Sequence, residues 1–120
     1  MCTSVGADVI LANLLVDDTD NGVSMKEIDI YCDALRNAIF TSQEKDIDKC
    51  IYIDLNSQSI SEVLRKYNSR FRFSEYGNRF YKNTSDNKIE LDIYNGQYPL
   101  TIKNILTETA KTVRTQFQHK

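Results

Sequence analysis

Three segments of the chain carry apolar residues at helical spacing. Residues 8–16 are mostly apolar and predict a buried helix, although a run this short is also compatible with a strand. Residues 24–40 predict the best-defined helix, because their apolar positions form one stripe and Ser24 with Glu27 makes a capping box. The last segment begins after Pro99 and has an apolar stripe made of Ile102, Ile105, Leu106, Val113 and Phe117.

The middle of the chain changes to strand spacing. Residues 50–55 alternate between two faces, with the β-branched Ile51 and Ile53 on the apolar one. A helix is predicted to follow at residues 59–67, because Ser59 and Glu62 make a second capping box ahead of another helical stripe. A strand therefore leads directly into a helix.

Further strands follow this helix. Residues 71–80 predict a hairpin, whose tight turn contains Gly77 and Asn78, residues that tolerate positive φ. Residues 89–94 alternate as one more antiparallel strand. The order of elements predicts an α+β fold with an N-terminal helical hairpin, a small antiparallel sheet with an inserted helix, and a C-terminal helix.

The composition of the chain limits the class of protein to which it can belong. Its 120 residues are 41% hydrophobic, which fits a single domain spanning residues 1–120. No apolar run reaches the roughly 18 residues of a membrane span, and Asp8 interrupts the start of the chain where a signal peptide would be apolar, so a cytoplasmic protein is expected. Cys2, Cys32 and Cys50 are odd in number and form no CxxC pair, which predicts buried or idle thiols and no zinc site.

Charge is distributed unevenly along the sequence. Residues 1–64 hold 4 basic and 12 acidic side chains, a net charge of −8. Residues 65–82 hold 6 basic side chains and 1 acidic one, a net charge of +5, although the whole chain carries −2. The two stretches therefore point to different kinds of partner.

The acidic turn at residues 17–22 has the oxygen-rich composition of a calcium loop. An EF-hand loop needs a glycine at its sixth position and a bidentate Glu at its twelfth. With Gly22 at the sixth position, Ile28 stands where the Glu belongs. The spacing favours a solvated turn, and neither a metal nor another cofactor is predicted.

The start of the second helix resembles the opening of winged helix-turn-helix domains. The resemblance rests on the residues that lead into this helix, Gly22, Val23, Ser24 and Glu27. It implies that residues 60–67 form the recognition helix and residues 71–80 the wing, with Arg72 and Arg79 near the arms of the wing. The chain departs from this pattern in the long charged connection before the central strand, although winged domains place a short strand in that region.

Basic and aromatic residues alternate through the predicted helix and hairpin. Cations neutralise phosphates and exposed aromatic rings stack on bases, so residues 59–82 predict a nucleic-acid contact. If Phe71 and Phe73 face inward, Arg70 and Arg72 share the outer face. The same alternation is also typical of any hairpin with one buried face. The candidate nucleic-acid-binding residues are Arg65, Lys66, Arg70, Arg72, Arg79 and Lys82.

An alternative hypothesis uses the acidic N-terminal half of the chain. A protein-binding module, such as an inhibitor or an immunity-type protein, would meet a basic target through its carboxylates, which steer association. The candidate residues are Asp17, Asp18, Asp20, Asp29 and Asp33. A homodimer that joins the two oppositely charged faces is also compatible with the charge pattern.

Catalysis has little support in the sequence. The single histidine, His119, lies near the end of the chain, where it is poorly placed to act as a general base. The least unfavourable enzyme is a metal-dependent nuclease, with Asp54 at a strand end and further members drawn from Glu75, Lys88, Glu90 and Asp92. A non-enzymatic binding or regulatory protein is therefore predicted.

Overall fold

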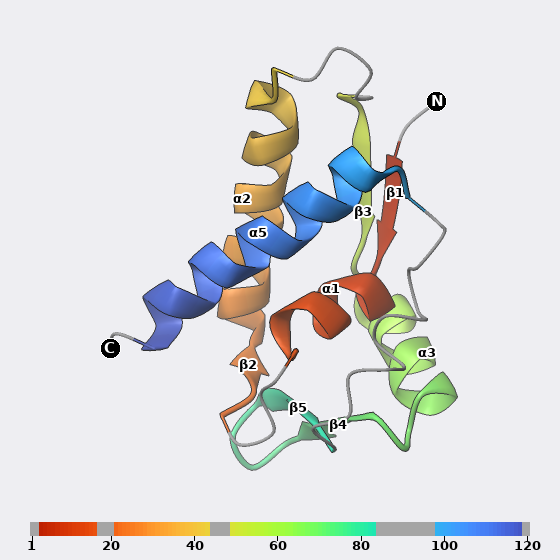
Figure 1. Ribbon diagram of the computed structural model, residues 1–120. Coiled ribbons are helices and arrows are strands. Elements are labelled where there is room, and N and C mark those ends of the chain that lie inside the picture. Colours follow the sequence, from red (N-terminus) through yellow and green to blue (C-terminus); the bar gives the residue numbers. More distant parts are fainter. Residues whose placement is uncertain (1–2, 17–20, 44–48, 84–97, 119–120) are drawn as a thin grey trace.

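The computed structural model describes residues 3–16, 21–43, 49–83 and 98–118, which form four helices and five strands (Figure 1). The helices are α1 (Ala7–Leu14), α2 (Met25–Thr41), α3 (Ser57–Lys66) and α5 (Leu100–Gln118). The strands are β1 (Thr3–Gly6), β2 (Val23–Ser24), β3 (Ile51–Asp54), β4 (Phe71–Ser74) and β5 (Arg79–Lys82). The predicted α+β class is confirmed.

The strands form two small sheets. The expected antiparallel sheet is present and contains the predicted hairpin, β4 and β5, but its third strand is the unpredicted β2, in the order β2, β5, β4. The predicted central strand β3 lies in a second sheet, where it pairs with β1 in parallel. This parallel pair was not predicted, because β1 has only four residues and too little alternation to stand out. Gly22 lets β2 approach β5: its φ is 64°, and a Cβ atom there would lie 2.5 Å from the carbonyl oxygen of Phe80.

The core lies between α1, α2 and α5. α1 is buried along nearly its whole length, and α5 crosses in front of α2 and packs against α1 (Figure 1). The buried Tyr31 of α2 donates its hydroxyl hydrogen to the Leu106 carbonyl of α5 at 2.9 Å. The predicted stripe of the last helix is confirmed, since Ile102, Leu106 and Val113 are buried.

Tyr98 joins the segment before α5 to the parallel strand pair. Its hydroxyl donates a hydrogen bond to the Ser4 carbonyl of β1 at 2.8 Å. Burial, with a smaller effect of the Asp8 carboxylate, raises the pKa of Tyr98 to about 12. The hydroxyl therefore keeps the proton that it donates throughout the ordinary pH range.

The helix caps confirm one prediction and correct another. Ser24 and Glu27 form the predicted capping box at the start of α2. α3 begins two residues earlier than predicted, because Asn56 is its N-cap. The Asn56 side chain accepts from the Ser59 N–H at 3.0 Å, and Ser59 Oγ accepts from the Asn56 N–H at 2.9 Å. The predicted box of Ser59 with Glu62 is therefore wrong, and the predicted strand at residues 89–94 lies outside the described residues.

The cysteines differ from one another. Cys32 is a buried free thiol, as predicted, and its burial raises the pKa of the thiol to about 11. Cys50 is disulfide-bonded, so the prediction of idle thiols is wrong for this residue. Within the described part of the chain, no helix is both long and apolar enough to cross a membrane.

Candidate functional site

α3 exposes most of its surface. Of its ten residues only Val63 is buried, while Ile60 and Leu64 pack partly against the core. The remaining exposed side chains are polar or charged: Ser57, Gln58, Ser61, Glu62, Arg65 and Lys66. The two cations lie in the last turn, where the helix dipole favours positive charge. α3 therefore presents a polar face that ends in two basic residues.

A tight connection fixes the basic end of α3 to the hairpin. The Tyr67 carbonyl accepts hydrogen bonds from the backbone N–H groups of Arg70 and Phe71, at 2.9 and 3.0 Å. The Tyr67 ring packs edge-on against Phe71, with 6.4 Å between the centroids, and the Lys66 ammonium lies 5.2 Å from the Tyr67 centroid. The helix and the hairpin are thus held in one arrangement.

The register of the hairpin defines its inner face. Phe71 lies opposite Lys82 and Phe73 lies opposite Phe80, so these four side chains share one side. Phe71 is buried, whereas Phe73 stays 39% exposed, with its ring centroid 4.8 Å from that of Phe80. Lys82 is only 1% exposed. Among the six basic candidates, Lys82 is therefore enclosed by the protein and is not presented to a phosphate.

The outer face of the hairpin carries Arg72. Its guanidinium carbon lies 4.5 Å from the ring centroid of Tyr81, the residue directly opposite on β5. This cation–π contact holds the arginine side chain over the ring while leaving the residue exposed. Arg70 is only partly exposed, and its Nε is buried without a hydrogen-bond partner among the described residues. Arg72 is therefore the best-presented cation of the hairpin.

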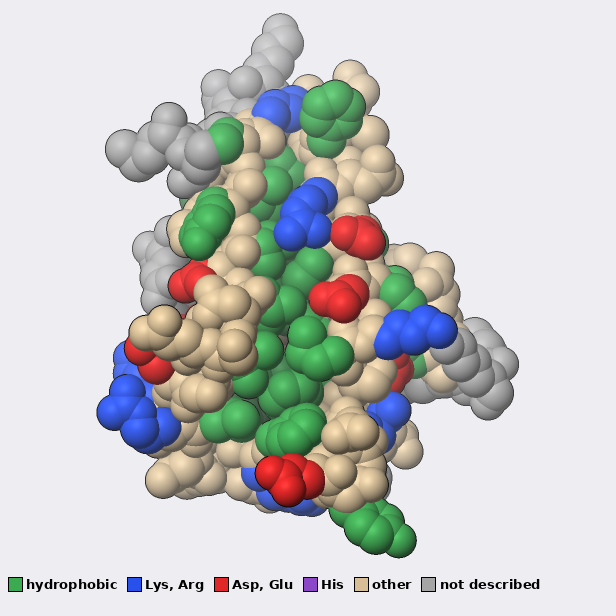
Figure 2. Space-filling model, turned by 180° about the vertical axis from the view of Figure 1, so that it is seen from behind, with side chains coloured by type: hydrophobic (Ala, Val, Ile, Leu, Met, Phe, Trp, Pro, Cys, Tyr) green, Lys and Arg blue, Asp and Glu red, His purple; other side chains and the backbone are tan. Residues whose placement is uncertain are grey.

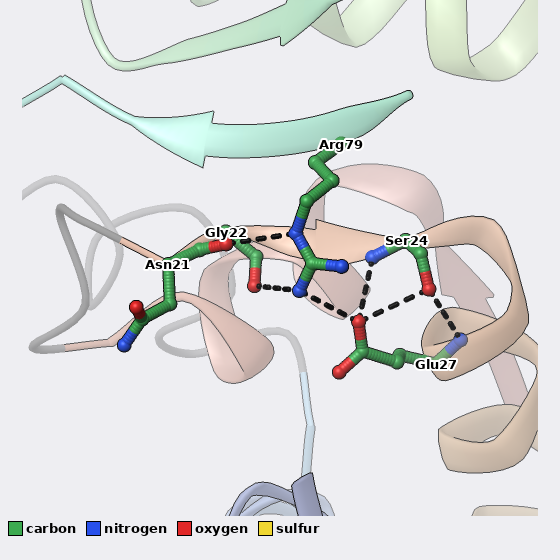
Figure 3. A network of polar contacts seen from close by, with 5 residues as sticks. All are labelled: Asn21, Gly22, Ser24, Glu27 and Arg79. Carbon is green, nitrogen blue, oxygen red and sulfur yellow. Dashed lines mark hydrogen bonds and ion pairs between the residues drawn. The ribbon is translucent and has the colours of Figure 1, made fainter. Parts of the chain in front are cut away.

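Arg79 joins the hairpin to the start of α2 (Figure 3). Its guanidinium donates to the carbonyls of Asn21 and Gly22, at 2.8 and 3.0 Å, and to the Glu27 carboxylate at 2.8 Å. The same carboxylate oxygen accepts from the backbone N–H and hydroxyl of Ser24, at 3.1 and 3.0 Å. Arg79 is thus committed to a structural contact that fixes the hairpin against α2.

The acidic candidates lie on a different element. Asp29 and Asp33 are exposed on α2, and Asp33 forms an ion pair with Arg36 at 3.1 Å. The other three acidic candidates lie outside the described residues: Asp17, Asp18 and Asp20. The structure therefore separates an acidic wall on α2 from the basic end of α3.

A polar hollow of about 190 Å³ lies at the carboxyl ends of β1 and β3. The carboxylates of Asp8, Asp54 and Glu62 line it together with Lys66. Asp54 is the strand-end residue predicted for a nuclease site, and Glu75 lies apart from it in the hairpin turn. The other nuclease candidates, Lys88, Glu90 and Asp92, lie outside the described residues. In the described ranges no three His, Cys, Asp or Glu side chains are grouped so that they could hold a metal ion.

Sequence reasoning missed part of the polar face of α3. Gln58 lies in its first turn, but the predicted helix began only at Ser59. The signal that could have found it is Asn56, a preferred N-cap residue three positions before Ser59. Starting the helix after Asn56 would have placed Gln58 and Ser61 together on its exposed side.

Compared with known proteins, the chain matches no family model, no curated protein and no solved structure. Its function is therefore proposed from the side chains that the fold presents.

Proposed function

We propose that this protein binds nucleic acid through α3 and the β4–β5 hairpin. The observation that carries the proposal is the exposure of Arg65, Lys66 and Arg72 at a junction that backbone hydrogen bonds hold fixed. Lysine and arginine that neutralise phosphates release condensed counterions, which supplies most of the affinity for nucleic acid. The proposed protein binds nucleic acid and does not catalyse a reaction on it.

The polar face of α3 adds side chains of the kind that contact bases. Gln58 is a long hydrogen-bonding side chain, and glutamine reads base edges in the major groove. Because Gln58 lies near the start of α3 and Arg65 near its end, a base contact by Gln58 and a phosphate contact by Arg65 would lie along one groove. This arrangement favours duplex DNA as the ligand.

The order of elements also supports the proposal. β2 lies between α1 and α2 in the chain and pairs with β5, so the hairpin that follows α3 is anchored to the start of α2. This resembles the order of the winged helix-turn-helix pattern, in which a wing accompanies a recognition helix. The chain departs from the pattern in β3, which lies between α2 and α3.

Two of the candidate cations are not available to the proposed interface. Arg79 is paired with Glu27 and Lys82 is buried, which removes two of the six candidate cations. A contact through the three well-exposed cations gives a slope of log affinity against log salt of roughly −3 on duplex DNA. We therefore expect the affinity to fall on the order of 40-fold between about 50 and 200 mM salt.

The test is fluorescence anisotropy with a labelled duplex and its single strand across this salt range. Replacing Arg65 and Arg72 together by Ala should weaken binding to the duplex and lower the salt slope by about 1.8, or roughly 0.9 for each lost phosphate contact. The matched control replaces Arg36 and Lys111, two exposed cations on α2 and α5, and should leave the slope unchanged. The proposal would be overturned if the affinity did not depend on salt concentration, or if both double variants lost affinity to the same extent.

A further inference from the structure

An apolar furrow runs along the face opposite α5, between α2 on one side and β3 and α3 on the other. Figure 2 shows this face, with a strip of hydrophobic side chains that extends along much of the molecule. Two hollows form the furrow, one of about 410 Å³ and one of about 330 Å³, and Leu55 lines both. The hollows are therefore neighbouring parts of one surface feature.

The larger hollow is lined mainly by apolar side chains that remain partly open to solvent. Met25 is the first residue of α2, Phe73 belongs to β4, and each side chain is 39% exposed. The apolar lining is Met25, Leu55, Ile60, Leu64, Phe73 and Phe80. Burial of apolar surface contributes about 25 cal/mol of stabilisation for each Å² removed from water, so a ligand that covered this lining would gain free energy. A contiguous exposed apolar surface of this kind marks an interaction site.

The smaller hollow has an acidic wall on α2. Asp29, Asp33 and Arg36 line it opposite Ile53 and Leu55 of the central strand segment. Asp33 is paired with Arg36, but Asp29 forms no ion pair with any described residue. A ligand that carries a lysine or arginine next to apolar side chains would complement both hollows at once.

The outer edge of β3 faces this furrow. The Cys50 carbonyl accepts from the Thr3 N–H at 2.8 Å, so the alternation of a parallel pair turns the backbone of Tyr52 toward β1 and that of Ile53 away from it. α2 lies beside β3 on this second side (Figure 1). No backbone hydrogen bond links Ile53 to a further strand in the described part of the chain. Unpaired strand groups offer hydrogen bonds to an extended segment.

We infer that the furrow binds an extended segment of another protein, one that carries apolar side chains and a lysine or arginine. The apolar side chains enter the hollow between Met25 and Phe73, and the cation lies beside Asp29. The acidic wall and the unpaired edge of β3 select this occupant. A second copy of the chain presents the same concave, acidic surface, and two such surfaces repel and do not interlock. The furrow uses Ile60 and Leu64 of α3, whereas the proposed nucleic-acid contact uses its cations Arg65 and Lys66.

The experiment selects linear peptides from a random displayed library on the full chain and measures their affinity by fluorescence anisotropy. We expect the selected peptides to share apolar residues with a nearby lysine or arginine. Asp29→Lys should weaken their binding about tenfold, because it places a like charge beside the cation. The matched control is Glu108→Lys on α5, an exposed acidic residue on the opposite side of the molecule, which should leave the affinity unchanged.

A second variant tests the apolar part of the furrow without touching the core. Ser61 is exposed and lines the larger hollow, so Ser61→Arg fills the hollow with a cation while α3 stays folded, as circular dichroism would confirm. It should weaken the selected peptides by at least about tenfold. The inference would be overturned if the selected peptides lacked a basic residue, or if neither variant changed their affinity. A dimer detected by light scattering and abolished by Ser61→Arg would also overturn it, since a second copy would then be the occupant.

Discussion

α1 and α3 are built in the same way and used differently. Each helix directly follows one strand of the parallel pair, α1 after β1 and α3 after β3. In α1 every residue except Asp8 is buried, whereas in α3 only Val63 is. α5 packs against α1, but it does not extend over α3 (Figure 1). The local strand–helix unit is therefore compatible with either role, and the role agrees with the composition of the helix, which is mostly apolar in α1 and mostly polar in α3.

This difference separates stability from binding. A helix that is apolar all round stabilises the fold through packing, and nearly all of its positions are constrained by neighbours. A helix with one apolar stripe leaves its other positions free to meet a ligand. α3 uses both sides in our proposals: its basic end belongs to the nucleic-acid contact, while Ile60 and Leu64 line the furrow.

The largest effect is expected for truncation of the α1 core. Leu11 is 1% exposed, so Leu11→Ala removes packed atoms and leaves a cavity, and it should lower the free energy of unfolding by about 2–5 kcal/mol. Leu64→Ala in α3 makes the same chemical change at a half-buried position and should cost about 1 kcal/mol. Urea unfolding measures both values, and similar losses in the two variants would contradict the contrast between the helices.

Cys32 on α2 belongs to the buried core, and it should make the stability of the fold depend on pH to an intermediate extent. Burial raises the pKa of this thiol from 9.0 to about 11, against a smaller opposite influence of Arg36. Because the folded state holds the proton more tightly, the contribution to stability is complete below pH 9 and is lost as pH rises toward 11. Unfolding curves across this range should show a decline on the order of 2 kcal/mol that is absent in Cys32→Ala. Parallel declines in the two proteins would show that Cys32 is not responsible.

The smallest effect concerns the start of α3. Asn56→Ala removes the side chain that caps Ser59 and should cost about 1 kcal/mol. The loss should be local, so hydrogen exchange should accelerate in the first turn of α3 and stay unchanged in α1. Gln58→Ala is the control, because its exposed side chain makes no described hydrogen bond, and it should change stability by less than about 0.5 kcal/mol. Accelerated exchange in both helices would show that they unfold as one unit.

Local signals in the sequence predict much of the fold. The capping box of Ser24 and Glu27, the hairpin turn with Asn78 at a φ of 53°, and the stripe of the last helix are all present. Each signal depends on residues within a few positions of one another, where helix spacing and turn chemistry act directly. The same reasoning placed the start of α3 late, because it selected Ser59 and overlooked Asn56.

The sequence by itself determined the α+β class, the main helices, the hairpin and the concentration of basic residues from the end of α3 through the hairpin. Only the tertiary structure decided which of these residues are available to a partner. Lys82 is buried because the register sets it beside Phe71 on the inner face, and Arg79 is held by Glu27, 52 residues away in the chain. The furrow likewise joins Met25, Leu64 and Phe73, which no local pattern connects. Burial and pairing arise from contacts between distant segments, and a sequence pattern of period two or 3.6 carries no information about which segments meet.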